Sequence, residues 1–211
     1  MPGTEPDDAL PRARVDHPWF SRGYPLAERA LERALGDARR AQNAQASGRT
    51  LIIGAGTGLD VPVLGRRTTD VVLLEPDATM RRTLSRRFPK WAIVGASAEA
   101  MPCTEGAFDT VISSLVLCSV GDVARVLDEI TRVLVPGGQY LFLEHIANPH
   151  RLASMVQKGI EPVWRRLGGG CRLTRDVETA VRQSPLTLTY FETVRAGGLL
   201  PVIRGRAMKS S

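Results

Sequence analysis

The chain has 211 residues, of which 43% are hydrophobic, 24% are charged and 5% are aromatic, and its formal net charge is +6. This length suits one α/β domain with a sizeable core and is short for two domains. The basic residues are scattered along the chain and aromatic residues are too few for a base-stacking platform, so nucleic acid is not an expected partner.

Three cysteines, Cys103, Cys118 and Cys171, show neither paired spacing nor metal-ligand spacing along the sequence. We therefore expect free thiols, no metal and a cytoplasmic location, because a reducing compartment keeps thiols unpaired. The first residues are polar and acidic, so neither a signal peptide nor a membrane anchor is expected. Residues 1–16 are predicted to be a mobile tail that precedes one domain over residues 17–211.

Hydrophobic periodicity predicts a chain in which strands and helices alternate. The first helix is expected over Leu26–Ala41. Strands follow near Thr50–Ile53, Val71–Glu75, Ala92–Val94, Thr110–Leu115 and Gln139–Glu144, with helices near Leu59–Leu64, Ala78–Phe88 and Val123–Val135. Later helices are expected over Leu152–Leu167 and Arg175–Gln183, and later strands over Leu186–Phe191 and Val202–Met208. This alternation predicts a doubly wound, mostly parallel sheet of seven strands that ends in an antiparallel hairpin at one edge.

A glycine-rich turn follows the first predicted strand. The apolar run ends at Ile53, and glycines occupy positions 54, 56 and 58. Glu75 closes the next apolar run about twenty residues later, the spacing from which a carboxylate can reach ribose hydroxyls. These features predict a nucleoside-bearing cofactor at the carboxyl ends of two adjacent parallel strands. The third glycine comes one place too early for the dinucleotide pattern, and no lysine follows to form a P-loop.

The pattern Gly54-x-Gly56-x-Gly58 followed by Asp60 resembles motif I of class I S-adenosylmethionine (SAM)-dependent methyltransferases. Two further segments, Ala96–Pro102 and Leu134–Gly138, are similar to the adenine loop and the helix-to-strand turn of the ubiquinone/menaquinone methyltransferase-like group. The resemblance runs from about His17 to Lys209. It implies a Rossmann-like sheet of seven strands, mostly parallel with an antiparallel last strand, in a single domain.

A narrower resemblance lies in several short motifs of the second half of the chain and one near its start. It is carried by Leu115–Val120, Glu144-His145, Pro162-Val163-Trp164, Gly170–Arg175 and His17–Phe20. These motifs look like those of the methyltransferase-like 7 family, whose characterised members methylate alkyl thiols. The resemblance therefore implies methyl transfer to a small, partly apolar molecule.

The resemblance also implies which residues bind SAM and its product, S-adenosyl-L-homocysteine. The glycines let the backbone approach the methionine part, Glu75 accepts hydrogen bonds from the ribose, and Ser114 and Leu115 flank the sulfonium. The full set of implied cofactor-binding residues is Gly54, Ala55, Gly56, Gly58, Glu75, Pro76, Ser97, Ala98, Glu99, Ser114, Leu115 and Tyr24.

Glu144 and His145 end the fifth predicted strand, at the edge where acceptor and cofactor should meet, and they are the candidate catalytic residues. His145 is suited to deprotonate an acceptor because imidazole titrates near neutral pH. A thiol acceptor needs little base catalysis, whereas a phenol or alcohol needs more. Trp164 and Cys171 are candidates for the wall of the acceptor site.

Three alternative functions are also compatible with these motifs. A quinone or phenol C- or O-methyltransferase would share the same cofactor motifs. A SAM-binding biosynthetic cyclase would keep the motifs without methylating. An NAD(P)-dependent oxidoreductase is the third, although its glycine spacing differs. The sequence does not indicate an oligomeric state.

Overall fold

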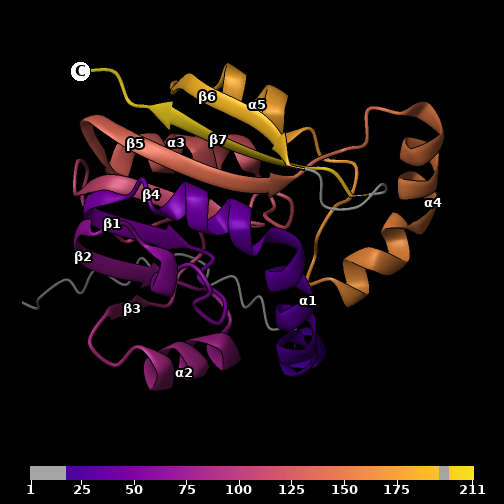
Figure 1. Ribbon diagram of the computed structural model, residues 1–211, viewed down its shortest axis with the longest axis horizontal. Helices are drawn as coiled ribbons and strands as arrows, with labels where there is room; N and C mark the ends of the chain where they lie inside the picture. Colours follow the sequence, from indigo (N-terminus) through magenta and orange to yellow (C-terminus); the bar gives the residue numbers. More distant parts are fainter. Residues whose placement is uncertain (1–17, 195–199) are drawn as a thin grey trace, which may run out of the picture.

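The computed structural model describes the backbone of residues 18–194 and 200–211, and the side chains within these ranges from residue 28 onward. The predicted tail, residues 1–16, lies outside this part of the chain. The described strands form one seven-stranded sheet in the order β3-β2-β1-β4-β5-β7-β6. Figure 1 shows this sheet with helices on both sides, which confirms the predicted doubly wound α/β fold.

The first five strands run parallel, and β7 pairs antiparallel with both β5 and β6. The strands are β1 (Ser47–Ile53), β2 (Arg67–Leu74), β3 (Ala92–Val94), β4 (Phe108–Ser114), β5 (Leu134–His145), β6 (Thr187–Val194) and β7 (Val202–Met208). The carboxyl ends of β1, β2, β4 and β5 therefore meet along one edge of the sheet. In parallel α/β sheets this is the edge at which ligands bind.

Five α-helices and one 3₁₀ helix connect or flank the strands in the described part of the chain. They are α1 (Pro18–Asn43), η1 (Val61–Val63), α2 (Ala78–Arg87), α3 (Val123–Val133), α4 (Arg151–Leu167) and α5 (Val177–Gln183). Buried residues of α3 and α5, such as Val126 and Val181, join one face of the sheet. Leu84 of α2 and Leu35 of α1 join core clusters on the opposite face. Residues of β1 alternate between the two faces, as a strand buried on both sides requires.

Two elements differ from the sequence prediction. The helix expected over Leu59–Leu64 is only the 3₁₀ turn Val61–Val63, because the segment is short and contains Pro62, which cannot donate a backbone hydrogen bond. The turn expected at Pro136-Gly137-Gly138 is instead a bulge inside β5. The ladder with β4 jumps there from Leu134 to Gln139, and Gly137 has a φ of 73°.

Helix α4 stands at one side of the molecule in Figure 1, away from the sheet. It carries most of the large hydrophobic side chains that are exposed in the described residues, namely Leu152, Met155, Val156, Ile160, Val163, Trp164 and Leu167. These positions recur at helical spacing, so they form one apolar stripe along α4. Within the described ranges, no helix has both the length and the apolar character needed to cross a bilayer.

Candidate functional site

The glycine-rich turn after β1 adopts backbone angles that require glycine. Gly54, Gly56 and Gly58 have φ values of 57°, 56° and 88°, in the left-handed region that side chains disfavour. A Cβ atom at Gly54 would lie 2.6 Å from Val116 Cγ2, and one at Gly58 would clash with the Phe88 ring. Ala55 is buried and its N–H donates to the Leu74 carbonyl at 3.0 Å. The turn is thus held tightly against β2.

Glu75 lies at the carboxyl end of β2 and is locked to this turn. Its Oε2 accepts a hydrogen bond from the Gly56 N–H at 2.8 Å, and its Oε1 accepts one from the Asp77 N–H at 2.8 Å. Burial raises the pKa of Glu75, and the two backbone hydrogen bonds partly oppose this effect. Each carboxylate oxygen keeps capacity for another donor. Next to it, the Pro76 carbonyl accepts from Arg81 Nη1 at 2.6 Å.

The segment after β3 packs beside Glu75. The Glu75 N–H donates to the Val94 carbonyl at 3.0 Å. Ala98 is buried, and the Ser97 hydroxyl donates to the Glu99 carboxylate. The other oxygen of Glu99 accepts from the Gly121 N–H at 2.8 Å. The polar groups of Ser97 and Glu99 therefore contact one another and the chain, which leaves the backbone around Ala98 as the better candidate for contact with an adenine.

Asp60 organises the other side of the turn, a role that the sequence analysis did not identify. Its buried Oδ1 accepts hydrogen bonds from Arg39 Nη1 at 2.9 Å, Asn43 Nδ2 at 2.7 Å and Ser114 Oγ at 2.7 Å. One carboxylate thus ties α1 and the end of β4 to the glycine turn. The sequence shows Asp60 just after the third glycine, but its hydrogen-bond partners are known only from the structure.

Glu144 supports the loop that follows β4. It is fully buried, and its Oε1 accepts from Ser113 Oγ at 2.6 Å and from the Val116 N–H at 3.1 Å, while its Oε2 accepts from the Leu117 N–H at 3.0 Å. Burial raises the pKa of Glu144 to about 7. In this loop Leu115 has a φ of 60°, an uncommon value for a residue with a side chain that often marks functional sites. The geometry favours a positioning role for Glu144 over the predicted role as a base.

His145 lies beside two cysteines that are distant in the sequence. One ring nitrogen of His145 and the Sγ atoms of Cys118 and Cys171 all lie within 4.8 Å of one another. A hydrogen bond from Cys118 lowers the pKa of Cys171, with a further contribution from His145, while the pKa of Cys118 is raised. Linear spacing gave no sign of this cluster, whereas the prediction of free thiols is confirmed for all three cysteines.

The two candidates for the acceptor wall, Trp164 and Cys171, lie next to each other in the structure. Trp164 of α4 hydrogen-bonds to Cys171, and its side chain is 38% exposed. Tyr24 lies within α1, but outside the residues whose side chains the structure describes. Its predicted contact with the cofactor therefore stays a prediction.

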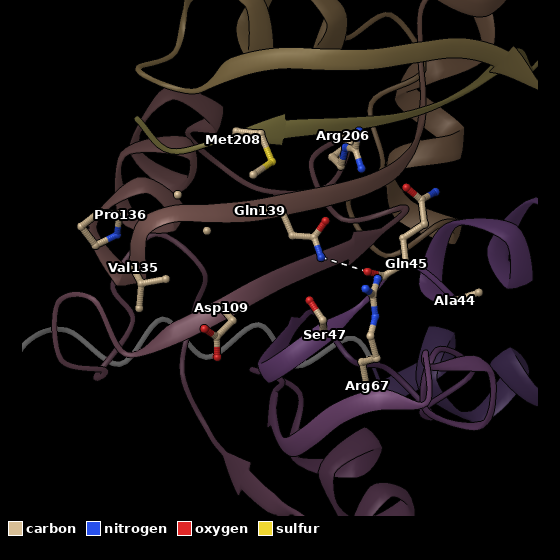
Figure 2. Close-up of a pocket in the computed structure, with 12 residues that line it drawn as sticks. Ala44, Gln45, Ser47, Arg67, Asp109, Val135, Pro136, Gln139, Arg206 and Met208 are labelled. Carbon is tan, nitrogen blue, oxygen red and sulfur yellow. Dashed lines mark hydrogen bonds between the residues drawn. The ribbon is translucent and has the colours of Figure 1, made fainter. Parts of the chain in front are cut away.

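A groove of about 530 Å³ opens at the opposite edge of the sheet, where β1, β2 and β4 begin. Figure 2 shows Ser47, Arg67 and Asp109 at this groove, with Gln139 donating to the Gln45 carbonyl at 2.9 Å. Because the predicted cofactor residues from Gly54 to Leu115 lie on or near the carboxyl edge, we do not assign this groove to the candidate site.

Comparison with known proteins finds methyltransferases among the relatives of this chain. The family model described as "Methyltransferase domain" matches residues 51–142. The thiol S-methyltransferase TMT1B of Homo sapiens is 42% identical over 85 residues, which cover 40% of this chain and 35% of that protein. Human thiol S-methyltransferase TMT1A is 32% identical over 174 residues, which cover 75% of this chain and 70% of that protein. A demethylmenaquinone methyltransferase of Renibacterium salmoninarum is 31% identical over 138 residues, covering 65% and 56%.

Solved structures share the fold at low sequence identity. A SAM-dependent methyltransferase from Thermotoga maritima superposes with a TM-score of 0.66 at 21% identity, covering 89% of this chain and 97% of that chain. Geranyl diphosphate C-methyltransferase from Streptomyces coelicolor, in complex with S-adenosyl-L-homocysteine, gives 0.68 at 14% identity, covering 85% and 77%. Fold, glycine turn and sequence similarity together show that the chain belongs to the class I SAM-dependent methyltransferases, in the family that includes the thiol S-methyltransferase TMT1A.

Proposed function

We propose that this protein transfers the methyl group of SAM to the sulfur of a small, partly apolar thiol. The observation that carries the proposal is the similarity to human TMT1A over 75% of the chain, combined with the locked turn and carboxylate at Gly56 and Glu75. The match to human TMT1B spans only about a third of that enzyme. The choice of a thiol acceptor therefore also depends on the residues of the site.

The residues at the carboxyl edge fit SAM. The left-handed glycine turn brings bare backbone to the end of β1, and Glu75 presents a fixed carboxylate at the end of β2, the group that pairs best with two ribose hydroxyls. The backbone around Ala98 would meet the adenine. The polar network of Asp60 and Ser114 lies between the turn and β4. When bound, SAM supplies a methyl group that is already activated on a sulfonium.

The protein must then align an acceptor with that methyl group and exclude water. Alignment at near-attack distance in a dry site can supply several kcal/mol of the barrier. Leu115 is fixed at the end of β4 by its own N–H, which donates to the Leu143 carbonyl at 2.8 Å. Glu144 fixes the next two residues. These contacts give the acceptor a rigid apolar floor, which suits a thiol that ionises easily and needs orientation more than proton removal.

Apolar surface near this floor supports an acceptor with a hydrophobic part. Trp164 connects Cys171 to the exposed stripe of α4. A phenol or quinone acceptor is the second candidate, because demethylmenaquinone methyltransferase is among the relatives and because His145, at the end of β5, would serve as the base.

The proposal is tested by incubating the full chain with SAM and a matched panel of alkyl thiols, phenols and a reduced quinone. We expect S-adenosyl-L-homocysteine to form with the thiols and mass spectrometry to locate the new methyl group on sulfur. Product formation only with phenols or quinones would move the assignment to the second candidate. Binding of S-adenosyl-L-homocysteine without turnover on any acceptor would favour a protein that does not methylate.

A further inference from the structure

Three side chains at the carboxyl edge have the composition of a metal site. Cys118 follows β4, His145 ends β5 and Cys171 follows α4, and their donor atoms all lie within 4.8 Å of one another. Ligands of one tetrahedral Zn²⁺ ion, with bonds of about 2.3 Å to sulfur and 2.0 Å to nitrogen, lie about 3.5–3.8 Å apart. A contraction of about 1 Å would therefore bring all three atoms onto a single ion.

The imidazole of His145 interacts with Cys171 but has no hydrogen bond of normal geometry within the described part of the chain. The residue is only 5% exposed. Burying a polar group without a hydrogen-bond partner destabilises the folded protein. A metal bond to one ring nitrogen would give the imidazole a partner of normal bonding geometry, which the described residues do not provide.

Surrounding hydrogen bonds hold the ligands in place from several directions. The Arg172 N–H donates to the Cys118 carbonyl at 2.9 Å. Arg175 Nη1 donates to the Leu117 carbonyl at 3.0 Å and the Val120 carbonyl at 2.7 Å, which braces the turn on either side of Cys118. The backbone just before Cys118 is held by Glu144. Preformed ligands supported in this way are what a tight metal site needs.

We propose that Cys118, His145 and Cys171 form a binding site for one soft metal ion, with Zn²⁺ as the expected occupant. Thiolate and imidazole ligands select Zn²⁺ or Cu⁺ over Mg²⁺ and Ca²⁺. Binding of Zn²⁺ forms two Zn–S bonds and one Zn–N bond, and each cysteine that is still protonated breaks its S–H bond and releases that proton to solvent. Two thiolates balance the charge of the ion, next to the cationic Arg175.

Three protein ligands leave one coordination position, which in zinc sites is the position that takes water or substrate. In one respect the inference deepens the proposed function and rests on it: the acceptor thiol would be a natural fourth ligand, as its thiolate. Metal binding itself is independent of that function.

The test uses the full chain, reduced and freed of metal with a chelator, and titrated with Co²⁺ and then Zn²⁺. We expect about one ion per chain, a near-ultraviolet thiolate-to-cobalt absorption band and its loss when Zn²⁺ displaces Co²⁺. Cys171→Ser and His145→Gln each remove one ligand and should weaken binding by more than about 100-fold, since the loss of an outer-shell partner alone costs 10- to 100-fold. Cys103→Ser is the matched control, because Cys103 lies outside the cluster, and it should bind metal like the wild type.

The inference is overturned if the reduced wild type gives no cobalt band, or if Cys171→Ser and Cys103→Ser bind equally well. A Cys118–Cys171 disulfide found by mass spectrometry after purification under reducing conditions would also overturn it. Calorimetry with S-adenosyl-L-homocysteine separates the two proposals. Cofactor binding without metal binding removes only this inference, whereas metal binding without cofactor binding removes only the proposed function.

Discussion

At the scale of single residues, the Glu75 carboxylate stabilises the glycine turn and is also the group proposed to bind the ribose. Glu75 accepts hydrogen bonds from Gly56 and Asp77 and so fixes the glycine turn relative to β2. The same two backbone donors fix the direction of its remaining acceptor sites. Substitution should therefore affect the shape of the turn as well as the recognition of ribose.

Glu75→Gln should weaken binding of S-adenosyl-L-homocysteine by about 10- to 100-fold, because hydrogen bonds to a charged group contribute about 1.5–3 kcal/mol. Isothermal titration calorimetry measures this loss. Glu105→Gln is the control, since Glu105 is an exposed carboxylate away from the turn. Equal affinities for the two variants would contradict the role of Glu75 in holding the cofactor.

At the scale of secondary-structure elements, two polar networks join helices to the loops of the site. The first runs from α1 through Asp60 to Ser114 at the end of β4. The second joins α3 to the end of the predicted adenine loop and to Cys103, which follows it. In it, Glu129 accepts from the Met101 N–H at 2.8 Å, and Arg132 donates to the Cys103 carbonyl at 2.7 Å.

Asp60→Ala should lower the free energy of unfolding by about 3–5 kcal/mol, because the buried Arg39 guanidinium loses its hydrogen-bonded carboxylate and keeps only a longer ion pair with Glu32 at 3.7 Å. The side chains of Arg39 and Asp60 are only 4% and 6% exposed. Chemical denaturation gives the value, and hydrogen exchange should show lost protection at the end of α1. Asp37→Ala is the control, because that side chain is fully exposed. Similar unfolding curves for both variants would refute a structural role for the Asp60 network.

The second network predicts a pH dependence. The hydrogen bond from Arg132 lowers the pKa of Glu129 from its usual value near 4.5. A carboxylate with a lowered pKa in the folded state stabilises the protein above its unfolded pKa, and this contribution is lost as the pH falls through the folded value. Glu129→Gln should therefore cost about 1–2 kcal/mol near neutral pH, a figure that allows for screening of the half-buried pair by solvent.

The difference between Glu129→Gln and wild type should shrink below pH 4.5 as Glu129 becomes protonated. Thermal unfolding across this range measures it. Glu178→Gln, which breaks an exposed pair with Arg182, should change stability little at any pH. If the difference in stability between Glu129→Gln and wild type stays constant with pH, the charge of the Glu129 carboxylate does not contribute to stability.

At the scale of the whole molecule, the antiparallel hairpin of β6 and β7 completes the sheet by close packing against β5. A Cβ atom at Gly205 of β7 would clash with the Phe142 ring of β5. Gly205→Ala should therefore lower the free energy of unfolding by about 1–3 kcal/mol through overpacking. Gly159→Ala is the matched control: it meets nothing within 4 Å in helix α4 and should raise stability by up to about 1 kcal/mol. Equal effects in denaturation experiments would contradict this account of the packing.

The sequence by itself determined the alternation of strands and helices, the glycine turn and the position of Glu75. Each of these depends on short-range chemistry, namely side-chain periodicity and the need for glycine where φ is positive. It did not reveal that Pro62 limits η1 to a single short turn or that residues 135–138 bulge inside β5, because the strand register sets how much of such a segment stays paired.

Only the tertiary structure decided which side chains meet. Asp60 binds partners from α1 and β4, and Cys118, His145 and Cys171 come together because β4 and β5 are neighbours while the chain after α4 returns to the same edge. Neither meeting leaves a regular spacing in the sequence. Strand order is fixed by burial of the whole core, so the chemistry at this edge follows from long-range packing rather than from any local motif.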